Sequence, residues 1–214
     1  MECHNSSNSS MYRFESSEAY WSCSSKGEGN YISPHGGYHV IPPKDKLFAL
    51  RTEISLALED ANIPIKYRHH EVGGAGQCQI ETPLLGLIRS ADASMMVKYF
   101  TKMIAANNNK TVTFLPKPLF GESGSGMHFH QLLFKSNINI FYDISDKYRL
   151  SQSAYYYIGG LLKHAPSVMA FTDPTTNSYR RLVPGFEAPI NCFFPSGNRS
   201  AAIRIPKYAT QPVF

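Results

Sequence analysis

The 214-residue sequence has no apolar run near the roughly 20 residues needed to span a membrane, and its first twenty residues have neither a basic start nor an apolar stretch. We therefore predict no membrane segment, no secretory signal and a cytoplasmic location. The cysteines (Cys3, Cys23, Cys78 and Cys192) form no CxxC pair, which argues against a thiolate zinc site or a disulfide framework. The formal charge is +5, but lysine and arginine form no basic run, so we expect no nucleic-acid partner.

The sequence mixes helical and strand patterns. Apolar spacing predicts helices over 46–61, 90–106 and 151–164, with Asp45 capping the first, Ser90 capping the second and Pro166 stopping the third. Strands are expected at 36–41, 63–72, 111–119, 126–135 and 201–205. Residues 1–30 read as an irregular polar start, and most of 174–206 as loops. Because there is no regular βαβ alternation, the fold class is predicted as α+β with a mainly antiparallel sheet.

Two histidines and one glutamate suggest a metal site. His128 and His130 lie two apart in a predicted strand, so their side chains share a face. Glu71 ends another predicted strand, beside the turn GGAGQ, which makes a Glu/His metal site geometrically feasible. The alternative is that the histidines satisfy core hydrogen bonds. A cupin-type site fails, because the glutamate that it requires three to four residues after the second histidine is replaced by Leu133 and Phe134.

Arginines cluster in the final third of the chain, where guanidinium groups could bind carboxylate or phosphate oxygens. They are Arg180, Arg181, Arg199 and Arg204. Arg204 should project opposite to Ile203 and Ile205, so it faces a cavity or solvent if the isoleucines are in the core. Glu187 lies on a loop bracketed by prolines. The alternative is that these are solvated arginines and a surface acid.

Five segments, taken together, are much more specific than any single motif. They are HHEVGGAGQ, FLPKPLFGESGSGMHFH, LSQSAYYYIGGLLKHA, DPTTNSYRRLVPGFEAP and NRSAAIRIP. In this order and spacing they resemble the type I glutamine synthetases over about residues 31–210. The resemblance implies a catalytic domain over 31–214, truncated at both ends, with a curved, mainly antiparallel sheet of the creatine-kinase-like kind flanked by helices.

The resemblance also implies a reaction. Family members join glutamate and ammonia at the expense of ATP, through γ-glutamyl phosphate, with Mg²⁺ or Mn²⁺ holding the phosphates. Hard cations favour oxygen ligands, which suits a site built mostly from glutamates with one histidine. Two alternatives remain open: a non-catalytic, glutamine-synthetase-like pseudoenzyme, and a related ligase that joins glutamate to another amine.

The motifs imply roles for particular residues. Glu71 and His128 resemble metal ligands, and His130 resembles the histidine that contacts the nucleotide. Gly124 matches a segment that lines glutamate, and Ser123 stands where the family usually has Asn.

The resemblance gives the arginines and the loop acid roles as well. Arg181 resembles the arginine that pairs with the substrate carboxylate, and Arg199 and Arg204 those that meet the ATP phosphates. Glu187 corresponds to the flap acid that takes a proton from ammonium. Glu187, Arg199 and Arg181 would therefore be the catalytic residues.

The sequence departs from the family pattern at one ligand. Gln79 stands where the family has a second glutamate; its amide offers an oxygen but no charge. Glu81 should not substitute, because two residues along a strand is a shift of about 7 Å. Further ligands and the N-terminal β-grasp domain are expected to lie outside the chain. We therefore expect the chain alone to make no glutamine and not to form the homo-dodecamer of full-length relatives.

Overall fold

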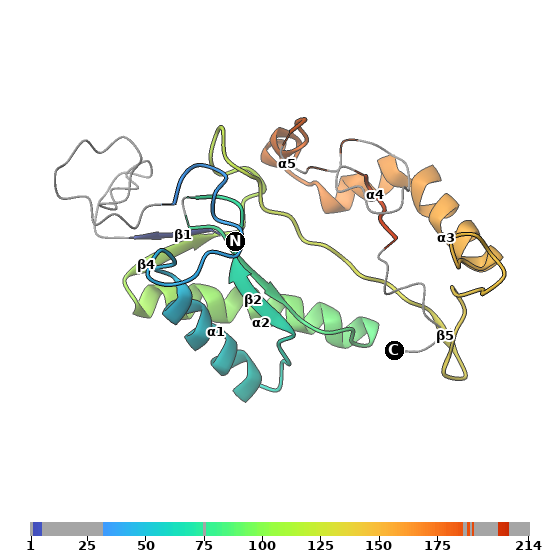
Figure 1. Ribbon diagram of the computed structural model, residues 1–214, viewed down its shortest axis with the longest axis horizontal. Helices are drawn as coiled ribbons and strands as arrows, with labels where there is room; N and C mark the ends of the chain where they lie inside the picture. Colours follow the sequence, from blue (N-terminus) through green and yellow to red (C-terminus); the bar gives the residue numbers. More distant parts are fainter. Residues whose placement is uncertain are drawn as a thin grey trace. The chain divides into compact units, whose positions relative to one another are not determined.

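The computed structural model describes residues 2–5, 32–74, 76–185, 188, 190 and 201–205. The chain divides into two compact units, Met1–Ser125 (unit 1) and Gly126–Phe214 (unit 2). Each unit has its own helices, strand pairs and buried residues (Figure 1).

Unit 1 combines two helices with two antiparallel strand pairs. The helices are α1 (Phe48–Asp60) and α2 (Leu87–Asn107). The pairs are β1 (Glu2–Asn5) with β4 (Lys110–Thr113), and β2 (Tyr67–His70) with β3 (Cys78–Glu81). Because β1 falls within 1–30, the prediction of an irregular start missed this strand.

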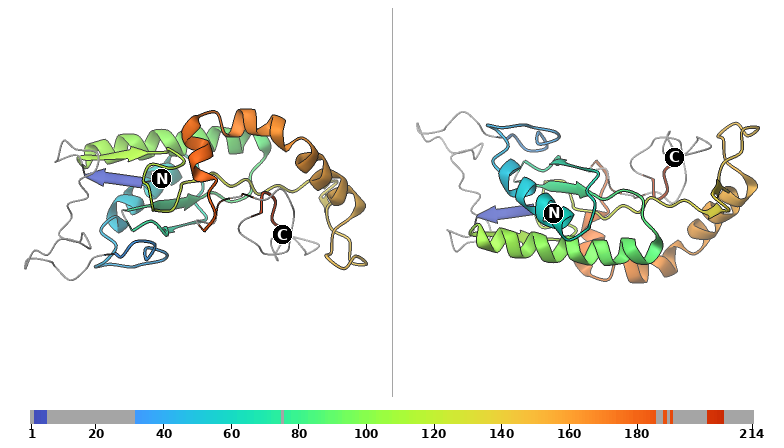
Figure 2. Two further views of the ribbon diagram at one scale, coloured as in Figure 1. Left: turned by 90° about the horizontal axis from the view of Figure 1, so that it is seen from above. Right: turned by 90° about the horizontal axis from the view of Figure 1, so that it is seen from below.

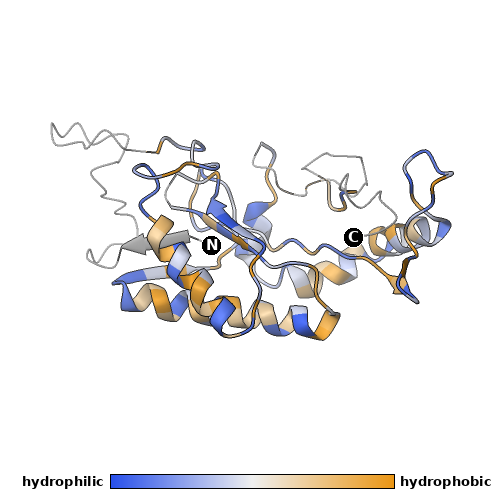
Figure 3. Cartoon of the chain, turned by 60° about the horizontal axis from the view of Figure 1, so that its bottom comes forward, coloured by the Kyte–Doolittle hydropathy of each residue, from blue (hydrophilic) through white to orange (hydrophobic). Residues whose placement is uncertain are grey.

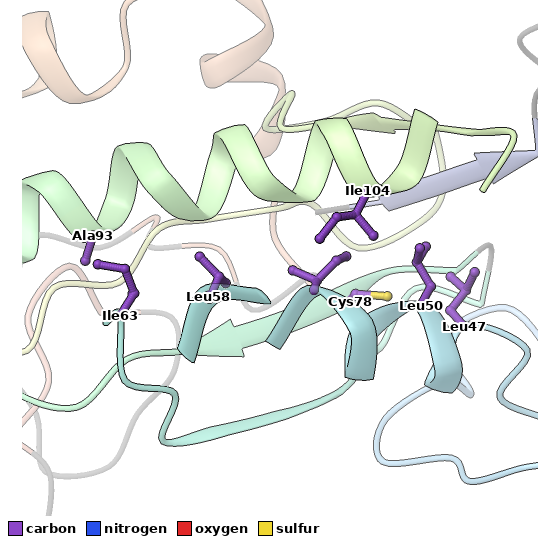
Figure 4. Close-up of a cluster of buried hydrophobic side chains, with 8 residues drawn as sticks. Leu47, Leu50, Leu58, Ile63, Cys78, Ala93 and Ile104 are labelled. Carbon is purple, nitrogen blue, oxygen red and sulfur yellow. The ribbon is translucent and has the colours of Figure 1, made fainter. Parts of the chain in front are cut away.

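The core of unit 1 lies between α1, α2 and the β2–β3 hairpin. Leu50, Ile54 and Leu58 recur every four residues along one face of α1 and are buried. Ile104 and Ala93 of α2 complete the cluster with Cys78 of β3 (Figure 4). The two helices pack against each other, and α1 lies next to α2 in both views of Figure 2. Hydrophobic residues recur along both helices (Figure 3). The helical spacing in the sequence therefore located this core correctly.

A buried ion pair fixes the start of α1. Asp45 Oδ1 accepts hydrogen bonds from the Leu47 backbone N–H (3.0 Å) and from Arg51 Nη1 (3.2 Å), and Oδ2 pairs with Arg51 Nη2. Both side chains are almost fully buried. Burial opposes the charge on Arg51, but its hydrogen bond to Asp45 and the adjacent Cys78 outweigh this effect, so the pKa of Arg51 is raised. The prediction that Asp45 caps this helix is wrong: Leu47 is the N-cap residue and has no side-chain cap bond, and Asp45 accepts from the Leu47 N–H just before the helix begins.

Several predicted boundaries in unit 1 are wrong. Ser90 does not cap α2: the helix already begins at Leu87, after Gly86, and the Ser90 hydroxyl donates to the Leu85 carbonyl at 3.4 Å. The strand expected at 36–41 is instead irregular, with a turn at Tyr38 and His39 and a φ of 57° at His39. β4 ends at Thr113 and β2 covers only part of 63–72. Pro116 and Pro118 follow β4 and lack the N–H groups that would continue its ladder.

Unit 2 contains a short hairpin and three helices. The hairpin pairs β5 (Phe134–Lys135) with β6 (Ile138–Asn139). The helices are α3 (Gln152–Lys163), α4 (Ala165–Thr172) and α5 (Thr176–Arg181). Leu150, Ala154 and Ile158 are buried together, and Ile203 and Ile205 pack against them.

The third predicted helix is nearly correct, but its surroundings are not. Ser151 caps α3 by accepting from the Ala154 N–H at 3.2 Å. Pro166 lies in the first turn of α4, so it opens a second helix rather than only ending the first. The supposedly loop-rich stretch also holds α5, whose start is fixed by reciprocal bonds between Thr175 and Ser178. This capping box uses Ser in place of the usual Glu or Gln, which hid it in the sequence.

Two predicted strands of unit 2 are not formed. Only 134–135 of the expected strand 126–135 is paired. Ser136 and Asn137, at positive φ angles, form a tight hairpin turn, and the returning strand ends at Asn139, whose carbonyl accepts from the Tyr142 N–H at 3.5 Å. Among the described residues 201–205, only Ala201 and Ile205 lie at β-bridges, and the residues between them form no continuous strand. Even so, helices with antiparallel strand pairs give the predicted α+β class. In the described part of the chain, the pairing is divided among three two-stranded sheets.

The helices described here include none that is both long and apolar enough to cross a membrane.

Candidate functional site

The β2–β3 hairpin sorts its side chains onto two faces. His69 lies opposite Gln79, and the Glu71 N–H donates to the Gln77 carbonyl at 2.8 Å, which continues the pairing past β2. Because side chains alternate along a strand, His69, Glu71 and Gln79 share one face. His70 and Cys78 lie on the other, where both are buried. The hairpin therefore uses one face for the core and presents the predicted ligands on the other.

Both histidines of the HHE motif are held by backbone carbonyls. His69 Nδ1 lies 2.8 Å from the His70 oxygen, and His70 Nδ1 lies 2.7 Å from the Glu71 oxygen. A carbonyl can only accept, so each Nδ1 carries the hydrogen. His70 is 1% exposed, and burial lowers its pKa. His70 is thus a neutral part of the framework beneath Glu71.

Aromatic contacts fix the His69 ring. It stacks on His39 with centroids 4.1 Å apart and planes at 13°, and Tyr38 meets it edge-on at 5.4 Å. His69 Nε2 lies 3.8 Å from Glu71 Oε1, which is too long for a hydrogen bond. The ring therefore forms a wall beside the carboxylate rather than a hydrogen-bond partner.

The Glu71 carboxylate is anchored at one oxygen. Oε2 accepts from the Val72 N–H at 2.8 Å, and the side chain is 21% exposed. Behind it, the Gly37 N–H donates to the Val72 oxygen at 3.1 Å. A Cβ on Gly37 would lie 2.6 Å from His70 Nδ1, so only glycine allows this close approach. Backbone packing thus sets the position of Glu71.

The donor set on this face suits a hard cation only in part. Glu71 offers a charged oxygen, and Gln79 is its diagonal neighbour across the hairpin, where Cα atoms are about 7 to 8 Å apart, within reach of one shared ion. Glu81 Oε1 accepts from Lys66 Nζ at 2.8 Å and is engaged there. Within the described ranges, no group of three or more His, Cys, Asp or Glu residues could hold a metal ion.

Gln77 joins the Glu71 turn to the predicted substrate segment. Its Oε1 accepts from the Gly73 N–H at 2.9 Å, and its Nε2 donates to the Gly124 carbonyl at 3.0 Å and to Ser125 Oγ at 3.2 Å. Gln77 is 4% exposed. Sequence reasoning missed this residue, although it ends the HHEVGGAGQ motif. Glu71, Gln79 and Gly124 therefore belong to one framework within unit 1, and Ser123 is half-buried next to Gly124.

The histidines of unit 2 lie in a stretch without regular secondary structure. His128 and His130 are exposed, and 126–133 is not part of a strand. The prediction that they share one face of a strand is therefore wrong, because the strand that returns after the hairpin turn ends at Asn139 and leaves that stretch outside the ladder.

The arginines of unit 2 differ in their surroundings. Arg181, at the end of α5, lies against Gly126, where a Cβ would be 2.8 Å from its Cζ. Burial lowers the pKa of Arg181, although Asp173 acts in the opposite direction. Arg204 is exposed, whereas Ile203 and Ile205 pack into the unit 2 cluster. The alternation predicted for Arg204 is therefore confirmed.

Two predicted catalytic residues, Glu187 and Arg199, lie outside the described residues. The roles that the resemblance implies for Glu71, His128, His130, Arg199 and Arg204 require one common site with residues from both units, and this site stays a prediction.

The chain matches the family model described as "Glutamine synthetase, catalytic domain" over residues 2–213. It is 47% identical over 207 residues to a glutamine synthetase of Streptomyces coelicolor, covering 96% of this chain and 44% of that protein. A glutamine synthetase of Mycolicibacterium smegmatis is 44% identical over 212 residues, with 96% and 44% covered. The chain thus spans less than half the length of these curated relatives.

The chain is also similar in structure to solved proteins. A cryo-EM structure of Plasmodium falciparum glutamine synthetase aligns with a TM-score of 0.79 at 36% identity, covering 84% of this chain and 34% of that one. A ligand-free GmaS structure aligns with a TM-score of 0.60 at 30% identity, covering 64% and 32%.

Proposed function

The chain belongs to the glutamine synthetase family, and from this premise we propose that it supplies residues to an ATP-dependent site that joins glutamate and ammonia. In this reaction the γ-carboxylate of glutamate attacks the γ-phosphorus of ATP and ADP leaves. Ammonia then attacks the carbonyl carbon of the γ-glutamyl phosphate, inorganic phosphate leaves, and a proton from the nitrogen goes to a base. Mg²⁺ or Mn²⁺, when bound, screens the charge between carboxylate and phosphates.

One observation carries the proposal. The turn that bears Glu71 and the segment that bears Gly124 lie 47 residues apart in sequence, measured from Gln77 to Gly124, and the Gln77 amide joins them. The first matches a metal ligand of the family and the second matches its glutamate-lining segment, with Ser123 beside it. A cation ligand and a substrate wall held on one framework are what transfer of phosphate to a bound carboxylate requires.

The cation ligands proposed in unit 1 are Glu71 and Gln79. Glu71 contributes charge from Oε1, since Oε2 is engaged by the Val72 N–H. Gln79 contributes a neutral amide oxygen, so it should hold a dication less firmly than the glutamate of the family pattern. His128 is proposed as the protein ligand of a second cation, near the nucleotide phosphates.

The remaining roles follow the family motifs. His130, Arg199 and Arg204 would contact ATP, and Arg181 would pair with the substrate carboxylate. Glu187 would accept the proton released as ammonia attacks. We further propose that residues 31–214 form part of the catalytic domain of a cytoplasmic enzyme, and that the homo-dodecamer belongs to its full-length relatives.

The test is a chimera in which residues 2–213 of this chain replace the matching segment of the Streptomyces coelicolor relative. We expect the chimera to form glutamine and release phosphate. Glu71→Ala should lower the rate by more than about a hundredfold, because a charged metal ligand is lost. Gln79→Glu should raise both the rate and the affinity for Mn²⁺.

Glu59→Gln is the matched control, since Glu59 is an exposed carboxylate on α1, and it should change neither rate nor affinity. A folded chimera that forms no glutamine, even with Gln79→Glu, would overturn the proposal. Activity regained only with Gln79→Glu would instead identify the chain as a non-catalytic relative.

A further inference from the structure

Gln77 uses its whole amide group to connect two loops. Its Oε1 takes the Gly73 N–H, and its Nε2 supplies both hydrogens, one to the Gly124 carbonyl and one to Ser125 Oγ. A flipped amide would place Nε2 against the Gly73 N–H and Oε1 against the Gly124 carbonyl, so the network fixes its orientation. With 4% exposure, the side chain has little access to water that could replace lost bonds.

The 116–125 loop is held at one end by its own backbone and at Gly124 by Gln77. The Ser125 N–H donates to the Pro116 carbonyl at 2.8 Å, which closes the loop. The Gly124 carbonyl is held from the side of the Glu71 turn by Gln77. On that side, a Cβ on Gly73 would lie 3.0 Å from Gln77 Oε1, so the turn is closely fitted to the amide. Length matters too, because asparagine is one methylene shorter and could not span both loops.

We infer that Gln77 is a positioning residue for glutamate binding, acting through the backbone of Gly124; this rests on the proposed function, in which Gly124 lines the glutamate site. Gln77 touches neither substrate nor metal in this role. It holds the Gly124 peptide at a fixed position relative to Glu71, so that a carboxylate substrate meets a wall already in place. Without it, the segment 123–125 would have to be ordered by the substrate, which weakens binding.

Gln77→Glu tests this with little change of shape. The carboxylate can still accept from the Gly73 N–H, but it donates to neither Gly124 nor Ser125, and it brings negative charge to the Gly124 carbonyl. Asn108→Asp is the matched control: Asn108 Nδ2 also joins two segments of unit 1, donating to Glu53 Oε2 (3.0 Å) and to the Ile104 carbonyl (2.9 Å). Both variants exchange an amide for an acid, and both place that acid against an acceptor.

Two measurements on the chimera with the Streptomyces coelicolor relative separate positioning from general stability. Hydrogen exchange of a peptide covering 122–127 should rise about tenfold or more with Gln77→Glu, and should not rise with Asn108→Asp. The Kd for L-glutamate should rise about tenfold with Gln77→Glu, while the Kd for ADP stays unchanged. Gln77→Asn should raise the hydrogen exchange and the Kd for L-glutamate in the same way, because its amide group is kept but its side chain is too short to bond both loops.

Each other result counts against the inference. Unchanged exchange over 122–127 would show that Gln77 does not hold the loop. Faster exchange with an unchanged Kd for L-glutamate would overturn the positioning role and leave the proposed function standing. If the unaltered chimera binds no L-glutamate, the proposed function fails together with the inference built on it.

Discussion

Unit 1 and unit 2 hold their proposed site residues in different ways. In unit 1, Glu71 and Gly124 are tied to the framework by hydrogen bonds and rest on a core of eight buried residues. In the part of unit 2 that the structure describes, His128, His130 and Arg204 are exposed, and the buried cluster consists of Leu150, Ala154 and Ile158. A rigid framework suits a cation ligand, whereas exposed side chains can adjust to a ligand such as ATP. The two units should therefore respond differently to substitution.

The largest effect is expected from Asp45→Ala in unit 1. The change leaves Arg51, which is 2% exposed, as an uncompensated buried charge, and should cost about 3 to 5 kcal/mol of unfolding free energy. Urea titration followed by hydrogen exchange should show the loss in α1 and much less of it in α3. Lys66→Ala, which removes an ion pair with a half-exposed lysine, should cost under about 1 kcal/mol. Equal losses of unfolding free energy in the two variants would show that burial of the ion pair does not set its contribution.

Gly37→Ala should have the next largest effect. The new Cβ would collide with the Glu71 carbonyl and the His70 ring, so it should cost about 1 to 3 kcal/mol and displace Glu71. Thermal unfolding and Mn²⁺ titration would check the two consequences. Gly86→Ala is the control, because nothing lies within 4 Å of its Cβ position. If Gly37→Ala matched it in both measurements, backbone packing could not be what positions Glu71.

The pH dependence of unit 1 should reflect His70. Because burial lowers its pKa below the usual value of 6.5, the folded state binds fewer protons than the unfolded state as the pH falls through 6.5. His70 therefore contributes stability that is complete above pH 6.5 and is lost below it. His70→Asn keeps a donor near the Nδ1 position but does not titrate. As the pH falls below 6.5, the unfolding free energy of the protein with His70 should decrease more than that of His70→Asn. A difference between the two proteins that does not change with pH would contradict this.

The smallest effect on stability is expected from Gly126→Ala in unit 2. The Cβ would meet the Arg181 guanidinium, the free end of a flexible side chain, which can move at a cost within about 0.5 kcal/mol. The Nε–H resonance of Arg181 should nevertheless shift, because its environment changes. Gly159→Ala, with open space in α3, should leave that resonance in place and stabilise the helix by about 0.5 to 1 kcal/mol. If Gly126→Ala instead lowered the unfolding free energy by several kcal/mol, unit 2 would tolerate an added Cβ no better than unit 1, and the difference between the units would be refuted.

Local patterns in the sequence predicted part of this structure well. The spacing of Leu50, Ile54 and Leu58 located α1 and its buried face, and Ser151 marked the start of α3. The alternation at Arg204 placed Ile203 and Ile205 in the cluster of unit 2, even without a strand. These predictions held because they depend on side chains a few residues apart, whose relative directions are set by backbone geometry.

Long-range pairing is where local patterns failed. The sequence of 1–30 gave no sign of β1, since a four-residue strand gains its stability from β4, more than a hundred residues later. The residues of 126–135 have the composition of a strand, but pairing is confined to Phe134 and Lys135, next to the turn at Ser136 and Asn137.

By itself, the sequence determined the family, the α+β class and the identity of Glu71, Gln79 and Gly124 as site residues to be tested, because long motifs and local periodicity are written in neighbouring positions. Only the tertiary structure decided how those residues are held. The Gln77 amide, the Gly37 approach to His70 and the His39–His69 stack each join segments separated by tens of residues. Such contacts depend on where the chain returns in space, and packing of the core decides that.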